Sequence, residues 1–172
     1  MVRTMAMEFE ADENCRYLDK QYLLGDSLLV APIFNAEGLA HYYLPAGCEW
    51  VNFFTGERVT GGVWRKEKHG YCSVPLWVRG GSILPTAIEA PDADVRFPGN
   101  LEFRVYALTD NARTEAYQDG AVVASIALHM KDGAASVEAD APGCRVRFIG
   151  QKHMTVSGRE TCPDGEDGIV ML

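Results

Sequence analysis

Beyond residue 36 the chain has no segment of helix length with helical amphipathic spacing, and this feature most restricts its fold. Turn signals rich in glycine and proline recur there about every eight to twelve residues, which is typical of short antiparallel strands. The aromatic-rich or alternating runs between these turns are residues 40–44, 49–54, 63–68 and 70–74. The pattern predicts an all-β protein built from two small antiparallel β-sandwich domains.

The later part of the chain continues the β pattern. Leu101, Phe103 and Val105 alternate with polar residues, which predicts a half-buried strand over 101–106. Asp119-Gly120 separates two further strand-like runs and predicts a tight hairpin. Residues 144–148 alternate in the same way.

Two stretches are interpreted separately. Residues 86–100 contain two prolines and several acids but few periodic apolar positions, which indicates a boundary or linker. The segment PLWVRGGSILP, residues 75–85, reads as two short strands joined by glycines that permit a bulge or a positive φ. We expect Arg79 in this segment to pair with a local acid or a carbonyl.

The first 36 residues differ from the rest. Residues 14–24 place Cys15, Leu18 and Leu23 at helical spacing, so we expect a helix here that Asp12 or Asn14 caps and Gly25 ends. Residues 27–34 are too short for a second helix and uniformly apolar, which favours a strand buried on both faces.

Composition excludes several classes of protein. The 172 residues carry 16 Lys and Arg against 24 Asp and Glu, a net charge of −8, which disfavours nucleic-acid and anionic-membrane partners. The five cysteines are widely spaced and odd in number, as expected of reduced thiols. The sequence shows no signal peptide and no apolar run of membrane-spanning length, so we expect a cytoplasmic protein.

Searches for reactive residues give no catalytic, cofactor-binding or metal-binding candidate. His69 and Cys72 form a single His-x-x-Cys pair with no second pair to complete a zinc site. Residues 164–167 are acidic but lack the ligand spacing of a calcium loop. A Gly-x-Ser-x-Gly elbow is absent from the sequence, and nothing singles out two of its 24 acids as a catalytic pair.

Aromatic residues crowd the first predicted sandwich. Exposed, they would form a platform that stacks on sugar rings; buried, they would fill a small core, and we favour the core. The residues concerned are Trp50, Trp64, Trp77, Tyr42, Tyr43, Phe53, Phe54 and Tyr71.

The order of segments resembles the C-terminal part of glycoside hydrolase family thirty-one, which contains retaining α-glucosidases and α-xylosidases. The strings that carry the resemblance are MVRTMAMEF, CRYLDKQYLLGDSLLVAPIF, YYLPAGCEWVNFFTGE, a Gly-Gly-x-Trp and HGYCSVPLWVRGGSILP. They cover residues 1–87, and the second is most similar to the bacterial α-xylosidases. Residues 90–172 fit only by position and β character.

The resemblance implies a division of the chain. Residues 2–9 look like the closing strand of a catalytic (β/α)8 barrel and residues 14–24 like its last helix, so 1–26 is a short strand-helix remnant of that barrel. Residues 27–88 look like a proximal and 89–172 like a distal C-terminal β-sandwich. None of the chain's aspartates stands in the family's nucleophile motif, so no catalytic residue is carried over.

The resemblance thus implies a non-catalytic C-terminal region of an α-xylosidase or α-glucosidase. Its partner would be the catalytic barrel, which hydrolyses terminal α-glycosidic bonds. The chain itself would support that barrel and contribute to oligomer contacts. The alternative is a carbohydrate-binding β-sandwich module with weak sugar contacts. A third interpretation is homodimerisation through residues 1–36, whose apolar face lacks the barrel that would cover it.

We expect the polypeptide alone to show no hydrolysis of aryl α-xylosides or α-glucosides, because a single strand and helix cannot close a barrel or position two carboxylates. A chromogenic assay checks this. Turnover that responds to mutation of a carboxylate would contradict it.

Overall fold

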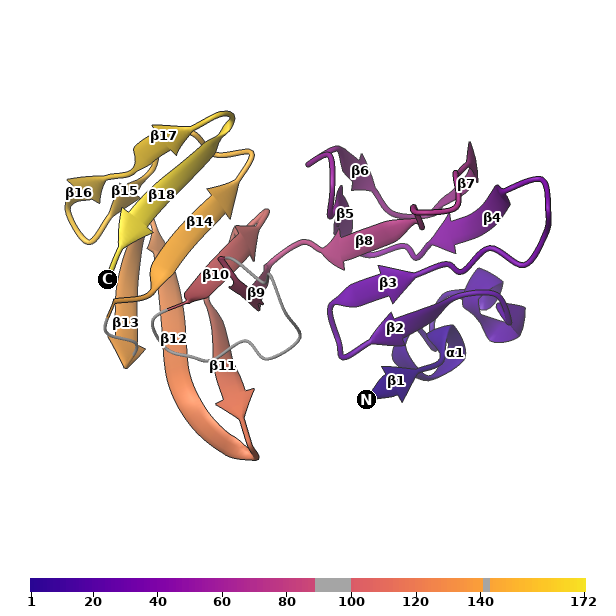
Figure 1. Cartoon of the computed structure of the whole chain (residues 1–172), viewed down its shortest axis with the longest axis horizontal. Coiled ribbons are helices and arrows are strands. Elements are labelled where there is room, and N and C mark those ends of the chain that lie inside the picture. The colour runs from indigo at the N-terminus through magenta and orange to yellow at the C-terminus, as the bar shows by residue number, and fades with distance from the viewer. Residues whose placement is uncertain (89–99, 141–142) are drawn as a thin grey trace. The chain divides into compact units, whose positions relative to one another are not determined.

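The computed structural model describes residues 1–88, 100–140 and 143–172 (Figure 1). Contacts group the chain into two compact units, Met1–Gly80 and Gly81–Leu172. Most of the predicted linker at 86–100 lies outside the described residues, and the three-part division at residues 26 and 88 stays a prediction. No helix in the described ranges is long and apolar enough to cross a membrane.

Unit 1 contains one six-stranded and one two-stranded sheet. The large sheet has the order β1-β2-β3-β8-β5-β6, and β4 pairs with β7 in the small one. The elements are β1 (Val2–Arg3), α1 (Met5–Glu8), the 3₁₀ helix η1 (Glu13–Tyr17), β2 (Tyr22–Leu24), β3 (Leu28–Val30), β4 (Leu39–Leu44), β5 (Glu49–Asn52), β6 (Arg58–Thr60), β7 (Val63–Lys68) and β8 (Leu76–Arg79).

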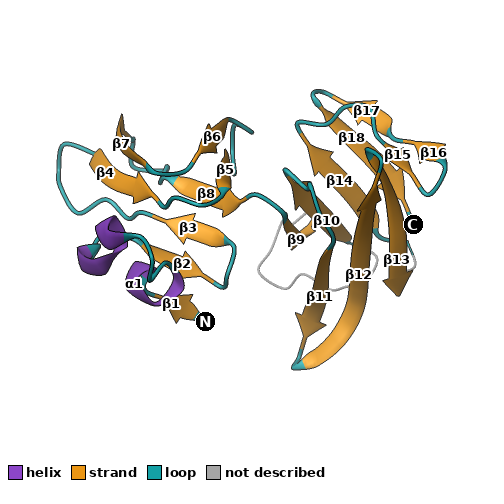
Figure 2. Cartoon of the chain, turned by 180° about the vertical axis from the view of Figure 1, so that it is seen from behind, coloured by secondary structure: helices purple, strands orange, loops and turns teal. Residues whose placement is uncertain are grey.

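The helix predicted over 14–24 is wrong. Asp12 does cap a helix, but only the short η1 follows, and Leu18 is already extended. Tyr22–Leu24 forms strand β2, which pairs with both β1 and β3. Sheet pairing and the burial of Leu23 therefore override the helical spacing of the apolar residues. Figure 2 shows that the helical residues (purple) all precede β2.

The expected barrel remnant is not seen in the described residues. Residues 2–9 do not form one strand, because β1 ends at Arg3 and α1 begins at Met5. Both β1 and β2 belong to the same sheet as β3, which lies between β2 and β8 (Figure 1).

The remaining strand predictions for unit 1 are partly confirmed. Strands β4, β5 and β7 lie in the runs 40–44, 49–54 and 63–68. Residues 70–74 form no strand, and β3 is shorter than the predicted 27–34, with only Leu29 of its residues fully buried.

Two buried tryptophans form the centre of the unit 1 core. Trp50 donates from Nε1 to the carbonyl oxygen of Pro45 at 2.9 Å, and Trp77 donates to the hydroxyl of Tyr42 at 2.8 Å. Both indole N–H groups are thus satisfied inside the core, as burial of a polar atom requires. Met5 and Leu23 join the same cluster, so the N-terminal segment is part of this core.

The described residues of unit 2 form two five-stranded sheets, with the orders β17-β18-β14-β10-β9 and β11-β12-β13-β15-β16. Their strands are β9 (Ser82–Ala87), β10 (Leu101–Tyr106), β11 (Ala112–Gln118), β12 (Ala121–Lys131), β13 (Ala134–Asp140), β14 (Arg145–Ile149), β15 (Thr155–Val156), β16 (Arg159–Glu160), β17 (Cys162–Asp164) and β18 (Asp167–Met171).

The unit 2 sheets are mixed, which corrects the antiparallel prediction. β10 pairs parallel with β14, and β13 pairs parallel with β15. The predicted strand 101–106 is confirmed as β10, and the predicted hairpin joins β11 to β12. Asp119 (φ 52°) and Gly120 (φ 81°) both take the left-handed conformation that a two-residue I′ turn requires.

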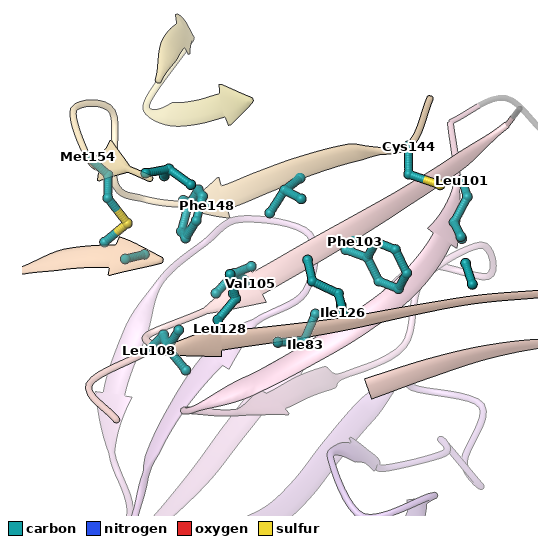
Figure 3. Packing of buried hydrophobic residues seen from close by; sticks show 14 of the residues in the cluster. Ile83, Leu101, Phe103, Val105, Leu108, Ile126, Leu128, Cys144, Phe148 and Met154 are labelled. Atoms are coloured by element: carbon teal, nitrogen blue, oxygen red, sulfur yellow. The ribbon is translucent and has the colours of Figure 1, made fainter. Parts of the chain in front are cut away.

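Side chains from both sheets form one buried cluster in unit 2 (Figure 3). Phe103 and Phe148 come from one sheet, and Ile126 and Leu128 come from the other. Glu102, next to Phe103 on β10, is also fully buried, and arginines satisfy its charge. Burial raises the pKa of its carboxyl, but the guanidinium groups of Arg104 and Arg147 outweigh this and hold the pKa below its ordinary value.

Two glycines of unit 1 give a matched test of packing. Gly38 and Gly25 both have φ +71°, but a Cβ on Gly38 would lie 2.3 Å from the carbonyl oxygen of His69, whereas Gly25 has open space. We expect Gly25→Ala to lower the free energy of unfolding by about 1 kcal/mol, from backbone strain alone. Gly38→Ala should cost about 1–3 kcal/mol more, because the backbone must move. Urea denaturation checks this, and equal losses would contradict it.

Candidate functional site

Arg79, the last residue of β8, contacts the N-terminal segment. Its Nη1 donates to Oε1 of Glu8 at 3.0 Å, and its guanidinium lies 4.8 Å from the ring centroid of Phe9. Glu8 also accepts from Nη1 of Arg3 at 2.9 Å. Burial raises the pKa of Glu8, but these arginines outweigh it and lower the pKa overall. Arg79 does pair with an acid, but the prediction of a local partner is wrong, because Glu8 lies 71 residues away.

Asp12 links η1 to the turn after β4. Its Oδ1 accepts from the backbone N–H of Asn14 at 3.1 Å, which caps the 3₁₀ helix. Its Oδ2 accepts from the hydroxyl of Tyr43 at 3.0 Å and from the N–H of Ala46 at 2.9 Å. Burial raises the pKa of Asp12, but the hydrogen bonds led by Ala46 and Tyr43 outweigh it, so the pKa is lowered.

Gln21 makes a second link to the same strand. Its buried amide donates from Nε2 to the carbonyl oxygen of Tyr43 at 2.8 Å and accepts from the N–H of Tyr43 at 2.8 Å. The side chain therefore replaces a neighbouring strand for that residue of β4. Sequence reasoning missed Gln21; the available signal is a polar residue between the apolar Leu18 and Leu23. We call Glu8, Asp12, Gln21, Tyr43 and Arg79 the N-terminal anchor.

The anchored segment leaves an apolar surface in water. Val2 and Leu24 are cross-strand partners in β1 and β2, and both are exposed. Met7 on α1 is 73% exposed. β1 is also the edge strand of its sheet, with unpaired backbone groups on one side. We call these three exposed apolar residues the N-terminal patch, because exposed apolar side chains suit a contact with protein rather than water.

The aromatic residues divide between core and surface. Trp50, Trp77, Tyr42 and Tyr43 are buried, which confirms the core interpretation for them. Trp64, Phe54 and Tyr71 are exposed, so that interpretation is wrong for these three, and Phe53 is half-buried. Trp64 lies on β7, a largely exposed strand, and the other two lie in turns.

The remaining sequence candidates have ordinary partners. His69 lies between Glu67 (Nε2 to Oε2, 3.2 Å) and Ser73 (Nδ1 to Oγ, 3.1 Å), and Cys72 is exposed. Asp164 and Asp167 pair with Arg147. Within the described ranges, no group of three or more His, Cys, Asp or Glu side chains could hold a metal ion.

Comparison with known proteins identifies the first half of the chain. A model of the glycosyl hydrolase family 31 C-terminal domain matches residues 1–84. An α-xylosidase from Emericella nidulans is 38% identical over 103 residues, which cover 55% of this chain and 13% of that protein. The chain thus spans about one-eighth of the length of this relative.

Solved structures extend the likeness over both units. The cycloalternan-forming enzyme from Listeria monocytogenes, in complex with a pentasaccharide substrate, superposes with a TM-score of 0.76 at 28% identity. That match covers 94% of this chain and 16% of the enzyme. A family 31 α-xylosidase from Xanthomonas citri gives a TM-score of 0.70 at 26% identity, covering 99% of this chain and 20% of its own.

The anchor generates a pH-dependent prediction. Because the folded-state pKa of Asp12 is lowered, its contribution to stability is complete above the unfolded-state pKa and is lost as pH falls through the folded-state value. We expect Asp12→Asn to lower the free energy of unfolding by about 1–2 kcal/mol at neutral pH. That difference should shrink towards pH values of about 3 in urea titrations.

The matched control for this measurement is Glu10→Gln, which neutralises an exposed carboxylate of the same segment. It should change stability by less than about 0.5 kcal/mol at either pH. A loss for Asp12→Asn that is independent of pH would contradict the assigned role of the charge.

Proposed function

Because residues 1–84 belong to glycosyl hydrolase family 31 as its C-terminal domain, we propose that the chain is the non-catalytic C-terminal region of a retaining α-glycosidase. The parent activity is hydrolysis of terminal α-glycosidic bonds by an α-xylosidase or α-glucosidase. The α-xylosidase relative supports this proposal, with only 13% of its length matched by the chain.

In this proposal the chain braces the catalytic barrel. Residues 1–26 are the segment that joins the region to the barrel, and the barrel covers Val2, Met7 and Leu24. The N-terminal anchor supports this role, because it fixes the segment on the β-sheet and leaves those apolar side chains outside. Burying them would gain about 25 cal/mol for each Å² of apolar surface removed from water.

Several described carboxyl groups act as structural acceptors. A retaining glycosidase needs a carboxylic acid whose pKa is raised so that it can protonate the leaving group. Six described carboxyl groups have a displaced pKa, and in each the pKa is lowered: Glu8, Asp12, Asp26, Glu67, Glu102 and Glu115. Each of these groups is thereby favoured in its ionised form, which suits an acceptor of hydrogen bonds from neighbouring donors.

Two further parts of the proposal concern the cellular compartment and contacts between copies of the chain. The five cysteines, all in the described residues, form no disulfide, which supports the cytoplasm as the compartment. The edge strand β1 and the N-terminal patch also suit a contact between two copies of the chain in the absence of the barrel.

A chimera tests the bracing role. We expect the α-xylosidase from Emericella nidulans to keep activity when residues 1–84 replace its homologous segment. Met7→Glu or Leu24→Lys in the chimera should then lower its thermal stability and its kcat together, because a charge would be buried in the domain contact. Differential scanning fluorimetry and aryl α-xyloside kinetics measure both effects.

The matched control is Phe54→Lys, at an exposed apolar residue of unit 1 outside the N-terminal patch. It should leave the chimera unchanged. If the patch variants behave like this control, the patch is not the surface that faces the catalytic domain.

A further inference from the structure

A hollow of about 450 Å³ lies on unit 1, apart from the N-terminal patch. It is formed by the end of η1, the loop before β2, the segment after β3 and the β4–β7 sheet. Val2, Met7 and Leu24 do not line it, whereas residues 17–21, at the end of the N-terminal segment, do. Its size falls within the range of about 300–1,000 Å³ that is usual for sites of small organic ligands.

The indole side chain of Trp64 lines this hollow. It stands opposite Tyr43 in the β4–β7 register, with ring centroids 5.2 Å apart, and its ring lies 5.0 Å from that of His41. Tyr43 is in turn held by Asp12 and Gln21 of the anchor. Trp64 therefore keeps a fixed orientation while half of it remains in water.

Two further aromatic side chains line the same hollow. Tyr17, at the end of η1, is 89% exposed, and Phe34, after β3, is 70% exposed. They come from segments on either side of β2 and β3 in the sequence, so the fold brings three exposed aromatic residues to one hollow. Side chains of this size are usually buried unless a partner covers them.

Polar groups alternate with these rings. Asp19, Lys20 and His41 line the hollow, and within the described residues their side chains make no hydrogen bond. They supply acceptors and donors of both charge signs, which a ligand rich in hydroxyl groups can satisfy. A purely apolar partner would leave them unpaired, at the cost that burial of unsatisfied polar groups carries.

We propose that this hollow binds an oligosaccharide, with a sugar ring stacked on Trp64 and its hydroxyl groups bonded to Asp19, Lys20 and His41. A pyranose ring has an apolar C–H face and a rim of hydroxyl groups, and the hollow offers an aromatic face and polar groups in the same arrangement. The site would hold oligosaccharide chains on unit 1.

The three tryptophans make binding directly observable. Trp50 and Trp77 are fully buried, so a fluorescence change on titration with α-linked gluco- or xylo-oligosaccharides reports on Trp64. We expect saturable binding by the full chain with a Kd on the order of 1 mM. Calorimetry should show that Trp64→Ala weakens binding at least about tenfold, as loss of a central aromatic contact does. Trp64→Tyr, which keeps a ring, should lose only a few-fold.

Further substitutions are placed at exposed side chains, so that a loss of binding is not caused by a loss of folding. Tyr17→Ala and Phe34→Ala alter exposed side chains and should each weaken binding, whereas Phe54→Ala, an exposed aromatic residue outside the hollow, should not. No response to any oligosaccharide, or an undiminished response in Trp64→Ala, would overturn the proposal. Concentration-dependent self-association of the chain that Trp64→Ala abolishes would instead assign the hollow to a second copy.

Discussion

The backbone of β4 has a ladder partner on one side only, and unit 1 depends on how the other side is satisfied. The backbone N–H of Tyr43 donates a hydrogen bond to the buried side-chain amide of Gln21, and its C=O accepts one from the same amide. The hydroxyl of Tyr43 donates to Asp12. These contacts join the first segment of the chain to the β-sheet. Without them, polar backbone groups would be buried without partners, which costs about 1–3 kcal/mol for each group.

The same contacts organise both proposed surfaces. In the proposed barrel contact, α1 and β1 carry the exposed Met7 and Val2. In the proposed oligosaccharide hollow, the ring of Tyr43 packs against Trp64. Binding residues that are held by a rigid network lose less conformational entropy when the ligand arrives. Under both proposals, one set of contacts would support a protein contact and a ligand site.

The sequence predicted what local patterns encode. The alternation over 101–106 and the Asp119-Gly120 turn place a strand and a hairpin correctly, because each depends on neighbouring residues. The helix predicted over 14–24 failed because pairing with β1 and β3 decides the state of Tyr22–Leu24. At the site, the sequence predicted that Arg79 pairs with a local acid or a carbonyl, but it did not identify Glu8 as the partner. The role of Gln21 was also missed. Both depend on contacts between residues that are distant in the sequence, and such contacts produce no periodic pattern of residue types.

Strand β8 has a consequence for the order of events during synthesis. It alone joins β1-β2-β3 to β5-β6, and it carries Trp77 into the core, yet it is the last strand of unit 1 to leave the ribosome. The nascent chain therefore holds two incomplete half-sheets with open edges until residues 76–79 emerge. Until then, the edges of β3 and β5 lack the strand that pairs with both of them in the folded unit.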